Sequence, residues 1–158
     1  MTTQTTAFDR RFAPSFDAAA DATSSPSSDD DTTHVGVHGG PRLLLRLEGA
    51  LVLALALTTY ASLGGSWGWL AALFFAPDVV LLGYLVSPRV GAAFYNAGHS
   101  YLGPALVAGI AFAFGAPTWA LLGALIWVGH IGFDRMLGYG LKHATSFFDT
   151  HLGRVGRH

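Results

Sequence analysis

The chain has 158 residues, of which 51% are hydrophobic and 12% are charged, and its formal net charge is −1. The charged fraction is about half of the roughly 25% found in soluble domains, and with a net charge near zero no basic patch suggests nucleic-acid binding. The absence of cysteine excludes disulfides, thiolate metal sites and cysteine nucleophiles. Almost every residue from Leu43 to Leu137 is apolar or glycine, so the composition predicts an integral membrane protein whose partner is the lipid bilayer.

Residues 1–41 are rich in Ser, Thr, Asp, Ala and Gly, and residues 23–31 read TSSPSSDDD. Such a segment cannot bury enough apolar area to offset the entropy of ordering its backbone. We therefore expect residues 1–41 to form a disordered cytoplasmic tail.

Four apolar stretches follow, each close to the roughly 20 residues that a helix needs to cross a bilayer. The predicted spans are residues 43–63, 67–86, 90–114 and 118–137. Short turns at residues 64–66 and 115–117 separate two pairs of them. Pro77 and Pro104 lie inside the second and third spans, where each is expected to free a backbone carbonyl one turn earlier, on Leu73 and Ser100. The predicted fold is all-α, with four transmembrane helices in residues 42–140 and a cytoplasmic segment in residues 141–158.

Basic residues indicate the orientation. The two short turns contain no Lys or Arg, and the basic residues near the span ends all fall on the other side: Arg42, Arg46, Arg89, Arg135, Lys142, Arg154 and Arg157. Cytoplasmic loops carry this excess in membrane proteins. Trp67, Trp69 and Trp119 flank the charge-free turns, as expected of an interfacial aromatic belt. We expect a prokaryotic inner (plasma) membrane protein with both termini in the cytoplasm.

Ionisable residues occur inside these apolar stretches. At about 1.5 Å per residue, Asp78 and His130 are predicted to lie roughly 16 and 18 Å from the outer turns. Glu48 comes to about 22 Å, and His99 and Asp134 to about 24 Å. A charge near mid-membrane costs at least about 2.5 kcal/mol, so these groups should face one another. The predicted polar cluster comprises Glu48, Asp78, Asn96, His99, His130, Asp134 and Arg135, with Glu48 and Arg135 at its edge.

Several roles are compatible with this cluster. Asp78 and Arg135 would form a buried ion pair, or Arg135 would extend to the membrane boundary; the histidines would be neutral and bonded to Tyr95, Tyr101, Asn96 or backbone. A structural or partner-binding protein needs no more than this. His99, His130, Asp134 and Asp78 are also suitable ligands for Zn²⁺, Mn²⁺ or Fe²⁺.

A metal site would serve an enzyme that activates water against a lipid or other amphiphile, although the sequence assigns no catalytic residue. The same His and Asp residues would instead relay protons in a small transporter or channel, for which four short spans favour a homo-oligomer.

Three motifs carry a resemblance to a known family. They are residues 95–101 (YNAGHSY), residues 130–142 (HIGFDRMLGYGLK) and residues 149–153 (DTHLG). Together they resemble the domain of unknown function 4260 family of small prokaryotic membrane proteins, over about residues 43–154. The resemblance implies a multi-helix membrane protein and implies no particular activity. Asp149 and His151 would add two ligand-type groups if their segment folds back under the cytoplasmic mouth of the bundle.

Overall fold

The computed structural model describes residues 36–37 and 39–154. The predicted disordered tail, residues 1–41, therefore lies outside the described residues except for residues 36, 37 and 39–41. The first helix already begins at Gly40, earlier than the predicted start at residue 43.

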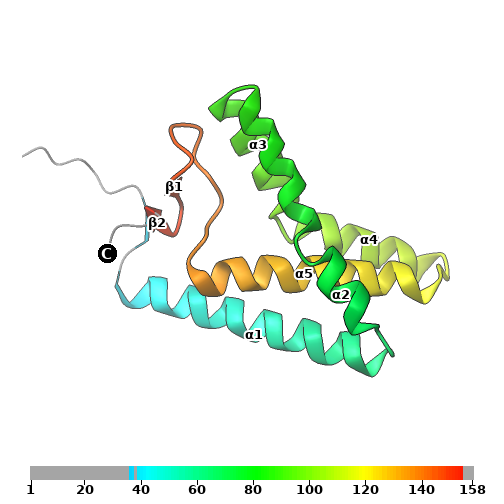
Figure 1. The fold of residues 1–158 in the computed structure, drawn as a ribbon. Coiled ribbons are helices and arrows are strands. Elements are labelled where there is room, and N and C mark those ends of the chain that lie inside the picture. Colours follow the sequence, from blue (N-terminus) through cyan, green and yellow to red (C-terminus); the bar gives the residue numbers. More distant parts are fainter. Residues whose placement is uncertain (1–35, 38, 155–158) are drawn as a thin grey trace, which may run out of the picture. The chain divides into compact units, whose positions relative to one another are not determined.

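The described residues are mostly helical (Figure 1). The helices are α1 (Gly40–Ser62), α2 (Trp67–Leu73), the 3-10 helix η1 (Ala76–Leu85), α3 (Pro88–Gly98), α4 (Leu102–Ala113) and α5 (Thr118–Leu137). Two short strands, β1 (Asp149–Thr150) and β2 (Gly153–Arg154), pair antiparallel after the last helix.

Helices α1 and α5 are continuous and lie side by side (Figure 1). Glycine permits this close approach, because a Cβ atom on Gly132 would lie 2.8 Å from the backbone nitrogen of Leu53 and 2.9 Å from the carbonyl oxygen of Gly49. Gly138 ends α5 in the left-handed conformation, with φ of 94°, as glycine commonly does after a helix. Both helices match their predicted spans.

The second predicted span consists of two helical pieces. Helix α2 ends at Leu73, and η1 begins at Ala76 with Pro77 in its first turn. Proline is tolerated in a first turn because the nitrogen there has no intrahelical acceptor. The predicted interruption at Pro77 is confirmed.

The third predicted span, residues 90–114, is not one continuous helix. Helix α3 ends at Gly98 and α4 starts at Leu102, so His99, Ser100 and Tyr101 form a break. Pro104 lies in the first turn of α4, where it cannot donate a hydrogen bond to the carbonyl of Ser100. The helix therefore restarts instead of continuing through the proline.

Three helical stretches within the described residues are long and apolar enough to cross a membrane: Gly40–Ser62, Trp67–Leu85 and Thr118–Leu137. Large apolar side chains are exposed on these and the neighbouring helices, including Leu51 at 60% and Phe112 at 85%. Apolar surface of this kind suits lipid contact and not water.

Packing brings the broken helices to α5. Helix α3 packs along η1, and α4 packs along α5 (Figure 1). Gly91 allows the first contact, because a Cβ atom there would lie 2.2 Å from the ring of Tyr84. Ser87 caps α3 by accepting a hydrogen bond from the backbone nitrogen of Val90 at 3.2 Å. The break between α3 and α4 consequently lies against α5.

Candidate metal centre

Two histidines and two aspartates meet at this break. Asp78 comes from the first turn of η1, His99 follows the last residue of α3, and His130 and Asp134 lie four residues apart on α5. One ligand atom from each of the four residues lies within 4.8 Å of the others. The sequence predicted that these four residues meet, and the structure brings them together.

The backbone sets the proton position of His99. Its Nδ1 lies 3.0 Å from the carbonyl oxygen of Tyr95, and the side chain is 1% exposed. A carbonyl oxygen only accepts hydrogen bonds, so Nδ1 carries the proton. In the neutral ring this leaves the lone pair of Nε2, which points into the cluster and is available to a metal ion.

His130 is equally buried, at 1% exposure. Its Nε2 lies 3.1 Å from Nε2 of His99 and 3.5 Å from Oδ1 of Asp78. Its Nδ1 has no hydrogen-bond partner among the described residues. The rings of Phe74 and Phe75 stand edge-on to it, with centroids 5.5 and 6.0 Å away. The polar contacts of this imidazole are therefore made by Nε2, on the cluster side.

The two carboxylates differ in their surroundings. Oδ2 of Asp134 lies 3.5 Å from Nε2 of His99 and accepts a hydrogen bond from the Tyr95 hydroxyl at 2.9 Å. Oδ1 of Asp78 lies 3.2 Å from the same nitrogen. The side chain of Asp78 is 33% exposed and that of Asp134 is 15% exposed. Asp134 thus has a tyrosine donor and is the more buried of the two carboxylates, whereas Asp78 is the more exposed.

Most of the distances between ligand atoms are close to those around one metal ion. Ligands at about 2.0–2.1 Å from a tetrahedral ion stand about 3.3–3.4 Å apart, and adjacent octahedral ligands stand about 3.0 Å apart. Four of the six distances among the cluster atoms measure 3.1, 3.2, 3.5 and 3.5 Å, and all four atoms lie within 4.8 Å of one another. The four side chains are therefore close enough to converge on one ion.

Two side chains of α5 hold the end of α3 in place. The indole nitrogen of Trp127 donates to the carbonyl of Gly98 at 2.6 Å, and NH2 of Arg135 donates to the carbonyl of His99 at 3.0 Å. These carbonyls belong to the last turn of a helix and lack intrahelical partners. The same two donors thereby fix the backbone that carries His99.

Arg135 does not form the predicted ion pair with Asp78 within the described part of the chain. Its guanidinium donates to the carbonyls of His99 and Tyr139, the second of which lies beyond the end of α5. Sequence reasoning missed the role of Trp127. Pro104 could have indicated this role, because a proline cannot donate to the carbonyls of the preceding turn and a side chain must do so instead.

Two residues of the predicted cluster lie outside it. Glu48 is exposed on α1 and does not belong to the group of four. The Asn96 side chain accepts a hydrogen bond from the backbone nitrogen of Lys142 at 2.7 Å and donates to the Lys142 carbonyl at 2.9 Å. Asn96 therefore anchors the C-terminal segment, and neither of these two hydrogen bonds involves the histidines.

The predicted additional ligand groups also lie elsewhere. Nδ1 of His151 accepts a hydrogen bond from the backbone nitrogen of Leu141 at 2.8 Å, and the Thr145 hydroxyl donates to Asp149 at 3.2 Å. Neither His151 nor Asp149 is in the group of four. Both belong to the local fold of residues 139–154.

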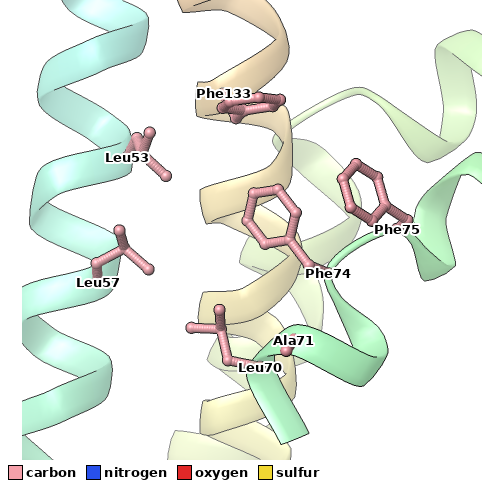
Figure 2. Close-up of a pocket in the computed structure, with 7 residues that line it drawn as sticks. All are labelled: Leu53, Leu57, Leu70, Ala71, Phe74, Phe75 and Phe133. Atoms are coloured by element: carbon pink, nitrogen blue, oxygen red, sulfur yellow. The ribbon is translucent and has the colours of Figure 1, made fainter. Parts of the chain in front are cut away.

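An apolar cleft of about 400 Å³ lies beside the cluster, between α1, α2 and α5 (Figure 2). Its lining residues are Leu53, Leu57, Leu70, Ala71, Phe74, Phe75 and Phe133. The rings of Phe74 and Phe75 line the cleft and also contact His130. One pair of aromatic side chains thus forms both a wall of the cleft and the apolar side of the metal centre.

Comparison with known proteins is limited to a family match. The family model described as a domain of unknown function (DUF4260) matches residues 42–155. No curated protein and no solved structure matches the chain. The match covers well over half of the sequence and agrees with the resemblance carried by the three motifs. The chain belongs to the DUF4260 family.

Proposed function

We propose that the chain is a multi-pass protein of a prokaryotic plasma membrane, with four membrane segments. In this arrangement α2 with η1 forms one broken segment, and α3 with α4 forms another. Three sufficiently long apolar helices support the proposal, as does the restriction of basic residues to one side of the segments. That side, with the start of α1 and residues 139–154, faces the cytoplasm.

Within this protein, Asp78, His99, His130 and Asp134 bind one divalent ion, namely Zn²⁺, Mn²⁺ or Fe²⁺. The observation that carries the proposal is the convergence of two buried imidazole Nε2 atoms and two carboxylates, with four contacts of 3.1 to 3.5 Å and all four ligand atoms within 4.8 Å of one another. The mixed nitrogen and oxygen ligands suit these three metals and not the all-oxygen preference of Mg²⁺ or Ca²⁺.

The reaction supported best is hydrolysis of an ester or phosphoester in an amphiphile. A bound divalent ion lowers the pKa of a coordinated water toward 7. Asp78 would hold the ion through Oδ1 and would take the proton of that water on its other carboxylate oxygen, because it is the more exposed of the two carboxylates and has no tyrosine donor such as the one that holds Asp134. The cleft beside His130 accommodates an acyl chain of the substrate, and its size lies within the roughly 300–1,000 Å³ typical of ligand pockets.

Metal analysis of the purified protein tests the centre. We expect about one equivalent of metal in the wild type, and loss of that metal in His99→Ala and His130→Ala. His143→Ala is the matched control, because His143 lies outside the group of four, and it should keep its metal. If the wild type never holds stoichiometric metal while the two substitutions only lower thermal stability, the cluster has a purely structural role.

Substitutions in α1 test the acyl-chain site. Leu57→Trp fills the cleft, so it should slow hydrolysis of long-chain esters more than that of short-chain esters. Leu55→Trp is the control on the same helix, since Leu55 is 57% exposed and does not line the cleft. Equal effects of the two substitutions on long-chain and short-chain esters would contradict the acyl-chain site.

Proton transfer is the second candidate, favoured by the close contacts that join the histidines. Asp78, His99 and His130 contact one another through Oδ1 and the two Nε2 atoms at 3.1 to 3.5 Å, short enough for a proton to pass along hydrogen bonds. Proton flux into liposomes tests this function. Flux that is present in the wild type and lost in Asp78→Asn and Asp134→Asn supports it, whereas flux that these substitutions leave unchanged contradicts it.

A further inference from the structure

The C-terminal segment, residues 139–154, is folded against α3 on the side of the metal centre. Lys142 pairs with Thr150 as an isolated antiparallel bridge, and Thr150 and Leu152 are fully buried at 0% exposure. The Asn96 side chain bonds both backbone groups of Lys142 at 2.7 and 2.9 Å. The Asn96 amide thus bonds the N–H and the C=O of one residue, as a neighbouring strand does in a sheet, and fixes the segment to α3 at Lys142.

Lys142 is the single lysine in a chain with eight arginines, and its side chain is almost completely enclosed. The residue is 5% exposed. Its ammonium group donates to the carbonyl of Phe147 at 2.8 Å and lies over the rings of Phe147 and Tyr95, 3.7 and 4.9 Å from the centroids. A desolvated ammonium over an aromatic ring is attracted by the negative face of the ring and so holds the ring in place.

Tyr95 connects this lysine to the proposed ligands. Its ring stacks on the imidazole of His99 with centroids 3.8 Å apart and an interplanar angle of 10°. Its hydroxyl donates to Asp134 at 2.9 Å, and its backbone carbonyl accepts from Nδ1 of His99. One residue therefore orients an imidazole and a carboxylate of the centre, and Lys142 lies over the ring of that residue.

We propose that Lys142 is a positioning residue for the metal centre, through which the C-terminal segment holds Tyr95 and thereby the ligands His99 and Asp134. The inference rests on the metal centre proposed above. Groups that orient metal ligands from behind typically change metal affinity by about 10–100-fold when they are removed. Because coupling between two sites is reciprocal, bound metal must also hold the segment in place.

The effect of Lys142 on the metal centre is tested by measuring the metal affinity of the full chain in detergent, by chelator competition. We expect Lys142→Met to weaken affinity for Zn²⁺ about 10–100-fold and to alter the visible absorption spectrum of the Co²⁺-substituted protein, which reports ligand geometry. Lys142→Arg keeps a cation over Tyr95 and should restore much of the affinity. Thr145→Ala, an exposed position in the same segment, should leave affinity and spectrum unchanged.

The reverse effect, that bound metal holds the C-terminal segment in place, is tested by acetylation of Lys142 in the unmutated protein. Because the chain has one lysine, the mass of a single peptide reports the labelling of Lys142. Removing metal with a chelator should speed this labelling, while the labelling rate of the α-amino group stays the same. The result does not depend on whether Lys142→Met folds.

The outcomes separate the inference from the proposed function. A wild type that binds no metal contradicts the metal centre itself. A wild type that binds metal, with equal affinity and an equal spectrum in Lys142→Met, contradicts only the positioning role. Labelling of Lys142 that does not respond to metal likewise contradicts the coupling and leaves the metal centre in place.

Discussion

Continuous and broken helices have different tasks in this protein. Helices α1 and α5 run without interruption over 23 and 20 residues and pack on each other through glycine. The segments α2–η1 and α3–α4 are each interrupted near a proline. Asp78 and His99 lie at or beside those interruptions, whereas His130 and Asp134 lie on the uninterrupted α5. A continuous helix thus provides the frame, and the broken helices bring their ligands to it.

The difference is one of hydrogen bonding. A continuous helix satisfies its own backbone groups, which a membrane interior requires. A broken helix leaves carbonyls that need donors from elsewhere, and Trp127 and Arg135 of α5 provide them at the end of α3. The donors that stabilise the break also determine where His99 lies. The break between α3 and α4 and the position of His99 in the candidate site therefore depend on the same two hydrogen-bond donors.

The largest expected effect comes from separating the two continuous helices. Gly132→Ala places a Cβ atom 2.8 Å from the backbone nitrogen of Leu53, so the helices must move apart. We expect a loss of stability of about 1–3 kcal/mol, as for overpacking elsewhere. Gly123→Ala on the same helix meets nothing within 4 Å and should be neutral or stabilising by up to about 1 kcal/mol. Thermal unfolding in detergent measures both, and similar losses for the two would contradict the close-packing argument.

An effect of similar size is expected at the break itself. Trp127→Phe removes the donor to the Gly98 carbonyl, which leaves a buried acceptor unsatisfied at a cost of about 1–3 kcal/mol. Because that carbonyl adjoins His99, metal affinity should fall as well. Trp119→Phe, at a position 72% exposed, serves as the control and should change neither quantity. A Trp127→Phe protein with reduced stability and unaltered metal affinity would show that the break does not position His99.

The smallest expected effect is a pH dependence in the C-terminal segment. Burial lowers the pKa of His151 below its usual value of about 6.5, consistent with a neutral ring whose Nδ1 accepts from Leu141. Below pH of about 6.5 the unfolded chain binds the proton more readily than the folded chain does. The stability associated with neutral His151 is therefore fully present above that pH and is lost as pH falls through the lower folded pKa.

His151→Gln isolates this contribution from that of the other histidines. Thermal unfolding of the wild type and the variant should be compared from pH 8 downward. The wild type should lose more stability than the variant as the solution becomes acidic. Parallel curves for the two proteins would mean that His151 does not change its protonation between the folded and unfolded states in this range.

Sequence reasoning succeeded where the pattern of single residues carries the information. Long apolar runs predicted α1 and α5, and glycine and proline predicted the turns and the interruption at Pro77. The free-energy cost of placing charged groups in an apolar segment led to the prediction that Asp78, His99, His130 and Asp134 lie together, and they do. The depth arithmetic worked less well for Glu48, because depth along a helix does not say which face a side chain occupies.

The amino-acid sequence by itself determined that helices are long and apolar enough to cross a membrane, and it determined the family and the residue types of a candidate metal centre. These follow from composition and from the energetic cost of ionisable groups in an apolar segment. Only the tertiary structure decided that His99 lies at a helix break, that Trp127 and Arg135 hold that break, and that Lys142 reaches Tyr95. Such contacts join residues 29, 36 and 47 positions apart in the chain. They depend on helix packing and rotation, which local sequence patterns do not specify.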